Sequence, residues 1–252
     1  MLNLTKQMFI SLSCLLALNC YAAQIQDSIV PDDAPLKIGT MQLPPYGWID
    51  KQGIKHGVIY DMNEEIGRRS GLAYENQILP FARMIEKLKT GEIDLISSLA
   101  HKPALDAGEQ LSIQHTVTVI VATRKNSNIH TINHLSGKHL VYIRSASYPQ
   151  LKDIPKRVSR VDNYRQSVQL LNNRPSVDGA VFTEPAYYYW VKTLGLKPDD
   201  FGSVIPIEQG KKQWIFVRKN LSEKRKEILK RVTDEIYKEK LYEKLLIKYG
   251  KS

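Results

Sequence analysis

Apolar residues along the chain recur with two different spacings, and these predict strands alternating with helices. Short apolar runs typical of strands lie at residues 36–40, 74–79 and 93–96. Between them, residues 60–69 and the segment with Met84, Ile85 and Leu88 place apolar side chains at helical spacing, and a glycine follows each of these segments. This β-α-β-α-β order is typical of a parallel sheet flanked by helices, so we predict an α/β fold.

The second part of the chain repeats this logic on a smaller scale. A nearly unbroken β-branched run at 115–123 predicts a buried strand that leaves the first unit. Strands are then expected at 140–143 and 177–182, with a helix at 164–171 between them, and we expect a helix after the turn at 144–148. A further strand at 214–217 precedes a long helical pattern that Ser222 opens and that ends near Tyr249, with a break around Lys240.

The first residues have the pattern of a signal peptide. A single cation, Lys6, precedes an apolar run at 8–18, and Cys20, Tyr21 and Ala22 form a small-x-Ala cleavage site. Cleavage after Ala22 predicts an exported, periplasmic protein. Both cysteines of the chain, Cys14 and Cys20, lie in this leader, so no disulfide or thiol site is expected in the mature part.

These segments predict a division of the chain into two lobes. We expect a signal peptide at 1–22, a first lobe at 23–122, a second lobe at 123–211, and a C-terminal return to the first lobe at 212–252. Each lobe is expected to be a mostly parallel sheet flanked by helices. The ligand cleft would lie between the lobes.

The formal net charge of +10 raises the possibility of nucleic acid binding. However, lysine and arginine are densest at 211–251, where acidic residues such as Glu227 and Glu235 interleave with them. Mixed signs along a helix indicate a solvated face. We therefore expect a monomer that does not bind nucleic acid.

Polar and aromatic side chains follow the predicted strands at the points where ligands bind in open α/β sheets. Tyr46 and Trp48 follow the first strand, and the alternative for them is to cover the core. Ser97, Ser98 and Lys102 follow the strand at 93–96. These residues are candidates for ligand binding.

Several segments, in this order, resemble the family 3 extracellular solute-binding proteins, which have a two-lobed periplasmic binding protein fold. The similar segments are LKIGTMQLPPYGW, GVIYDMNEEIGRRSG, PFARMIEKLKTGEIDLI, LSGKHLVYIRSASY, DNYRQSVQLLNNRPSVDGAVFTEPA and KLYEKLLIKYG. The resemblance implies capture of a small polar or charged solute, often an amino acid, for an ABC importer of the inner membrane. A sensory module for a membrane receptor or kinase is an alternative. A dehydratase acting on cyclohexadienyl acids is a third, and Glu184 would be its acid.

The chain departs from this family at the arginine that clamps the carboxylate of amino acid ligands. In the family's Ser-x-Thr-x-x-Arg stretch, Leu105 stands where the arginine belongs. Lys102 could supply a point charge from the same turn. The family's Pro-aromatic-x-Arg variant matches residues 80–83, which makes Arg83 the candidate for the main anion-binding side chain.

The resemblance also implies binding residues in the second lobe. Residues 144–148 resemble an Arg-Gly-Ser-x-Tyr turn whose amides at a helix start receive an anion. Glu184 aligns with the acid that holds a ligand ammonium group, although a carboxylate before Pro185 is also typical of a helix start. The candidates here are Arg144, Ser145, Ser147, Tyr148 and Glu184.

No cofactor or metal site is predicted. His130 and His134 have the spacing of a metal pair on a helix, but no third ligand is near them in the sequence. The continuous aromatic run Tyr187 to Trp190 has no single face, so we expect it to combine core packing with a partner surface.

Overall fold

The apolar runs of the N-terminal part form three parallel strands. The computed structural model describes residues 34–144, 146 and 148–249; the predicted leader, Ser145 and Ser147 lie outside them. Strands β1 (Leu36–Met41), β4 (Tyr74–Leu79) and β5 (Leu95–Leu99) lie in the order β4-β1-β5. Leu36 pairs with Tyr74, and Ile38 pairs with Leu95. The predicted β-α-β-α-β unit is confirmed.

Helices flank these strands as the apolar spacing predicts. Helix α2 (Val58–Ser70) buries Val58, Met62 and Ile66, and it ends at Gly71, whose φ of 71° is left-handed. Helix α3 (Phe81–Thr90) buries Met84 and Leu88. A short helix that the periodicity did not reveal, α4 (Lys102–Ala107), follows β5.

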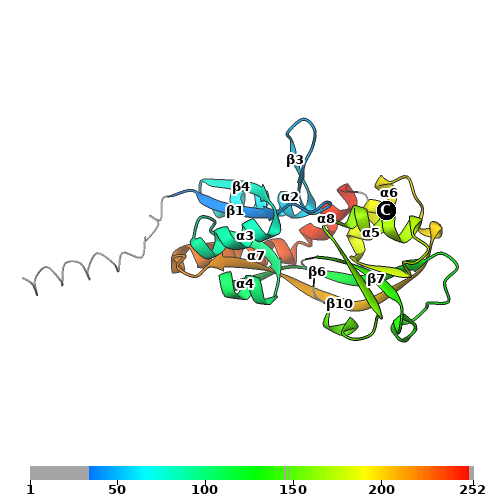
Figure 1. Ribbon diagram of the computed structural model, residues 1–252. Helices are drawn as coiled ribbons and strands as arrows, with labels where there is room; N and C mark the ends of the chain where they lie inside the picture. Colours follow the sequence, from blue (N-terminus) through cyan, green and yellow to red (C-terminus); the bar gives the residue numbers. More distant parts are fainter. Residues whose placement is uncertain (1–33, 145, 147, 250–252) are drawn as a thin grey trace, which may run out of the picture. The chain divides into compact units, whose positions relative to one another are not determined.

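Two long antiparallel strands lie side by side in the middle of the sheet and connect its two parts. β6 (Gly108–Arg124) and β10 (Phe201–Arg218) pair with each other, with several register shifts along their length. Near one end β10 pairs with β5, and near the other end β6 pairs with β9. Figure 1 shows β6 and β10 passing from the part of the sheet beside α3 and α4 to the part beside α5 and α6. The predicted boundaries, 122/123 and 211/212, fall inside these strands; the assignment of residues to lobes stays a prediction.

The second part of the sheet is built from β7 (His139–Ile143), β8 (Arg157–Val161) and β9 (Gly179–Thr183), with helices α5 (Tyr164–Asn173) and α6 (Glu184–Thr193). β7 lies parallel to both β8 and β9. The complete eight-stranded order is β4-β1-β5-β10-β6-β9-β7-β8. Below, the first half means β4, β1 and β5 with their helices, and the second half means β9, β7 and β8 with theirs.

The helix expected after residues 144–148 is wrong. Only a 3-10 turn, Pro149–Leu151, follows, and β8 begins soon after it. Asp153 has a φ of 61°, outside the right-handed helical region, and this interrupts a helix at this point. The remaining 3-10 turns are Ile132–Leu135 and Pro198–Asp200.

The C-terminal helices return to the first half. The side chain of Ser222 accepts a hydrogen bond from the amide of Arg225 and caps α7 (Glu223–Lys238). Lys240 then has a φ of 54°, and α8 (Leu241–Lys248) begins after it. The expected helix break is therefore confirmed. Tyr249 donates a hydrogen bond to Asp61 of α2, so the end of the chain contacts the first half.

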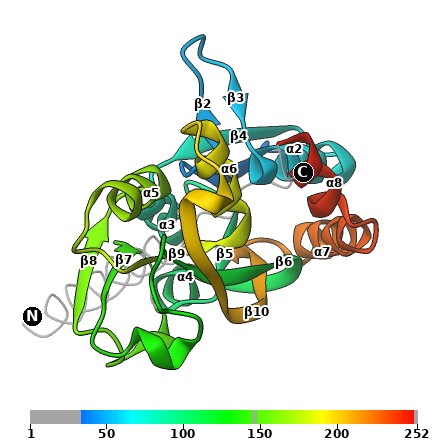
Figure 2. The ribbon, with the colours of Figure 1, turned by 90° about the vertical axis from the view of Figure 1, so that its right-hand side faces the viewer.

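A small hairpin, β2 (Trp48–Ile49) and β3 (Lys55–His56), projects from the first half. Figure 2 shows it extending outward beside α6 of the second half. Trp48 packs against Tyr189 of α6, with ring centroids 5.8 Å apart. Within the described residues, none of the helices combines the length and the apolar character needed to cross a membrane.

Candidate functional site

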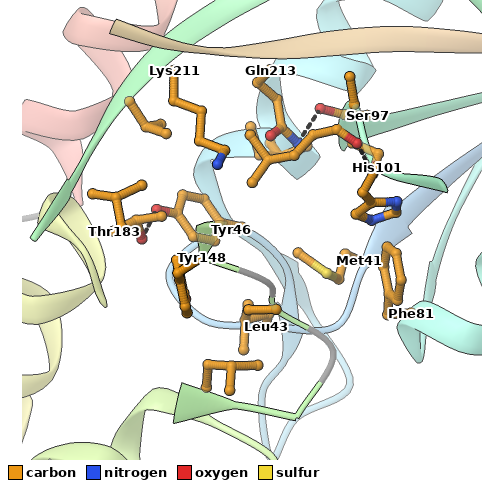
Figure 3. A pocket seen from close by; sticks show the side chains of 18 of the residues that line it. Met41, Leu43, Tyr46, Phe81, Ser97, His101, Tyr148, Thr183, Lys211 and Gln213 are labelled. Atoms are coloured by element: carbon orange, nitrogen blue, oxygen red, sulfur yellow. Dashed lines mark hydrogen bonds between the residues drawn. The ribbon is translucent and has the colours of Figure 1, made fainter. Parts of the chain in front are cut away.

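A cavity of about 500 Å³ lies between the two halves, over the strands β6 and β10. Its volume lies within the range of roughly 300–1,000 Å³ that is usual for small-molecule sites. Figure 3 shows side chains of both halves converging on it. The first half contributes Met41, Leu43, Tyr46, Ile59, Phe81 and 97–103. The second half contributes Ile143, Ala146, Tyr148, Pro149, Tyr164 and Thr183. The long strands contribute His115, Val117, Val119, Lys211 and Gln213.

Tyr46 is held in the wall by the loop that follows β1. Its carbonyl oxygen accepts hydrogen bonds from the amides of Ile59 and Tyr60 at the start of α2. Gly57 passes so close that a Cβ atom there would lie 2.2 Å from this carbonyl oxygen, and its φ of 135° also favours glycine. The hydroxyl groups of Tyr46 and Thr183 share a hydrogen bond of 2.5 Å, which joins the first half to the second.

Ser97 belongs to a chain of buried hydrogen bonds that reaches the cavity from the core. Asn63 of α2 accepts from Gln114 at 3.1 Å, and the hydroxyl of Ser97 donates to Gln114 at 2.5 Å. The same hydroxyl oxygen accepts from the amide of Gln213 at 3.1 Å (Figure 3). Ser97 thus orients Gln213 in the wall, while the hydroxyl of Ser98 donates to the carbonyl of Leu99.

The floor residues His115, Val117, Lys211 and Gln213 were missed in the sequence analysis. They come from strands whose pairing places Lys211 opposite Val117 and Gln213 opposite His115. Alternate residues of a strand share a face, and this spacing of two was the available signal. It could not be used because residues 201–213 were not recognised as a strand.

The tyrosines that line the cavity keep their hydroxyl protons. Burial raises the pKa of Tyr46, Tyr148 and Tyr164 above the ordinary value. These hydroxyl groups can therefore donate hydrogen bonds to a ligand at neutral pH. Ile143, Val119 and Leu43 add apolar surface to the same lining.

The structure brings part of the predicted set together. Five of the candidates line the cavity: Tyr46, Ser97, Ser98, Lys102 and Tyr148. Lys102 lies at the exposed start of α4 and forms an ion pair of 2.8 Å with Asp106. Ser145 and Ser147 fall outside the described residues. The binding of ligand by the cavity-lining candidates stays a prediction.

Four further candidates are not among the residues that line the cavity. Arg83 is exposed on α3, and Arg144 is exposed and forms an ion pair of 2.9 Å with Asp162. Trp48 lies in the hairpin, where its ring stacks on His56. Glu184 begins α6 directly after Thr183. Their role in ligand binding also stays a prediction.

The aromatic run in α6 divides between the core and the other half. Tyr187 is fully buried. Trp190 donates a hydrogen bond of 3.1 Å to the carbonyl of Pro44, and Tyr189 contacts Trp48. Part of the surface that was expected to contact a partner therefore contacts the first half of the same chain.

His115 makes the stability of the protein dependent on pH. It is buried, it stacks on Tyr242 with ring centroids 3.8 Å apart, and burial lowers its pKa to about 3. The unfolded chain binds a proton at this histidine near pH 6.5, whereas the folded protein does so only near pH 3. The contribution of neutral His115 to the free energy of unfolding is therefore complete above pH 6.5 and is lost as the pH falls toward 3. The loss approaches roughly 1.4 kcal/mol per pH unit.

The variant His115→Phe should therefore show a shallower decline of the free energy of unfolding between pH 6.5 and 4.5 than the wild type. Urea unfolding at several pH values measures both slopes. Equal slopes would show that the imidazole is not held neutral by burial.

Comparisons with known proteins agree with this architecture. Residues 36–252 match the model of the bacterial extracellular solute-binding proteins, family 3. A search of curated proteins gave no significant match. An ancestral arginine-binding protein bound to arginine is 22% identical with a TM-score of 0.69, and the match covers 85% of this chain and 97% of the other.

Two further solved structures have the same fold. The GluR0 ligand binding core in complex with L-glutamate is 15% identical with a TM-score of 0.71, covering 87% of this chain and 99% of the other. The periplasmic VFT2 domain of Bordetella pertussis BvgS is 16% identical with a TM-score of 0.70, covering 87% and 94%. The chain therefore belongs to the family 3 bacterial extracellular solute-binding proteins and has their two-lobed α/β fold.

Proposed function

We propose that the protein is a periplasmic receptor that encloses a small solute between its two lobes and delivers it to an ABC importer of the inner membrane. The observation that carries the proposal is the cavity, because residues of both halves and of both long strands line it. A solute in this position would contact both lobes at once. Binding would then favour the arrangement in which the lobes are closed.

Direct contacts between the halves support a closed arrangement. Tyr46 bonds to Thr183, and Trp190 donates to the carbonyl of Pro44. Tyr46 and Pro44 lie in the loop after β1, whereas Thr183 ends β9 and Trp190 lies in α6. These contacts would break if the lobes opened, whereas β6 and β10 would bend at their register shifts. The two strands are therefore the proposed hinge.

The lining favours binding over catalysis. Dehydration of a cyclohexadienyl acid needs a general acid in contact with the substrate. Among the described lining residues there is no aspartate or glutamate, and Glu184 is not one of them. His115 is neutral through the physiological pH range because burial lowers its pKa to about 3.

A thermal-shift screen against amino acids, polyamines, dipeptides, sugars and small carboxylates tests the proposal. Binding to the native state at 100 times the dissociation constant stabilises it by roughly 2.7 kcal/mol, so at least one solute class should raise the melting temperature. No response to any class would contradict the receptor function. Uptake of a labelled hit by cells with and without the gene then separates import from sensing, because only import requires the protein for uptake.

A further inference from the structure

The charged groups of the cavity have one sign. Two lysines, Lys102 and Lys211, are among its lining residues, and the described lining contains no carboxylate. Lys102 lies at the rim, with its side chain 84% exposed, and its partner is Asp106. Lys211 is different, because only 19% of its side chain is exposed and its amino group is directed into the cavity (Figure 3).

Lys211 is held in place from outside the cavity. Its Nζ atom lies 2.6 Å from Oε2 of Glu208, and Glu208 is not among the lining residues. An ammonium group has three donors, so Lys211 can keep this ion pair and donate to a ligand as well. Gln213, two residues along the same strand, uses one amide hydrogen on Ser97 and has a second. Both side chains therefore bring hydrogen-bond donors to the lining of the cavity.

An ammonium group on the ligand would find no carboxylate among the described lining residues. The hydroxyl of Ser97 already donates to Gln114 and accepts from Gln213. Lys211 would repel a second cation at short range. A buried ammonium group without a carboxylate carries a large desolvation cost.

The remaining walls are apolar. Met41, Leu43 and Phe81 of the first half, Val117 and Val119 of β6 and Ile143 of β7 all line the cavity. Such surfaces accommodate an aliphatic or aromatic body, and burial of that body stabilises the complex through the hydrophobic effect.

We infer that the ligand is a carboxylic acid with an apolar body and no amino group, bound by its carboxylate to Lys211. This inference rests on the proposed receptor function and narrows its solute class. It also identifies Lys211, rather than a residue at position 105, as the side chain that carries the charge for recognition.

The test uses matched probes that share one body and differ in charge. 3-Phenylpropanoate, L-phenylalanine and 3-phenylpropan-1-ol form one set, and hexanoate, L-norleucine and hexan-1-ol form a second. Calorimetric titration of the wild type should give at least ~10-fold tighter binding for an acid than for its alcohol, since a hydrogen bond to a charged group is worth at least that factor. The acid should also bind more tightly than its amino acid, because the ammonium group of the amino acid would lose its hydration without gaining a carboxylate partner.

The variant Lys211→Met should lose the ~10-fold preference for the acid over the alcohol and bind the alcohol as the wild type does. Lys212→Met is the matched control, because the adjacent Lys212 is exposed and does not line the cavity. If Lys211→Met does not fold, the pair Glu208→Gln and Lys211→Met restores the charge balance and serves in its place.

The outcomes separate this inference from the proposed function. An amino acid that binds as tightly as its acid, or an equal loss in Lys212→Met, overturns the inference. The same holds if other solutes of the screen bind and no acid does, and the receptor function then still stands. If no solute of any class binds, both proposals fail.

Discussion

Replacing Asp94 with alanine is expected to lower the free energy of unfolding by roughly 3–5 kcal/mol, because it leaves buried arginine without its counterion. Asp94 and Arg218 have only 4% and 3% of their side chains exposed, and Nε of Arg218 donates to Oδ1 of Asp94 at 2.6 Å. The second carboxylate oxygen accepts from the amide of Lys37 at 2.8 Å. Asp94 thus joins β1 to Arg218 at the end of β10. The same strand, β10, also contains Gln213 of the cavity lining.

Urea unfolding at neutral pH measures this effect. The matched control is Glu92→Ala, which breaks the exposed pair with Lys87 and should leave the free energy of unfolding nearly unchanged. Asp94→Asn, which removes the charge and keeps the shape, should also be strongly destabilising. If Asp94→Ala were as mild as Glu92→Ala, the buried pair would not stabilise the fold as argued.

Replacing Val117 with tryptophan is expected to weaken solute binding by at least ~100-fold, because the larger side chain occupies the floor of the cavity. Val117 is 6% exposed and lies opposite Lys211. Cavity space receives the added ring, so the protein should remain folded. Calorimetric titration with any hit of the screen measures the change.

The neighbouring residue provides the control. Thr118 points to the opposite face of β6 and does not line the cavity, so Thr118→Trp should bind the same hit with an affinity close to that of the wild type. Equal affinity of Val117→Trp and the wild type would place the solute elsewhere.

Local sequence patterns were sufficient to predict an element where that element buries one face against neighbours close in sequence. The strand at 74–79 was predicted with the bounds it has, and a helix break was predicted around Lys240, where the structure has it. Both depend on short-range periodicity, and both occur in segments with clear glycine or charge boundaries.

Elements that depend on distant pairing were missed. The first part of β10 contains Pro206, Gly210 and a polar stretch, and it becomes a strand only through irregular pairing with β6. The start of helix α6 at Glu184 was considered only as an alternative, and its extent was not predicted because its aromatic residues form no single face; part of that surface contacts Pro44 and Trp48 of the other half. The pairing of β10 with β6 and the contacts of α6 join residues that are far apart in the chain, so a pattern within a short stretch of sequence does not reveal them.

The same distinction applies to the site. The aromatic loop at Tyr46 and the serines near the end of β5, Ser97 and Ser98, were found because strand ends are expected binding positions. Lys211 and Gln213 come from the middle of β10 and reach the cavity only through their pairing with β6. A resemblance to a family indicates binding residues only at positions within the segments that resemble it. Lys211 lies in none of those segments.

A crystal structure of the protein with a solute identified by the screen tests the central claim most directly. The account predicts electron density for the solute between Tyr46, Tyr148 and Lys211, with a polar group within hydrogen-bond distance of Nζ of Lys211. Density for the solute outside this cavity, with Lys211 contacting only Glu208, would contradict it.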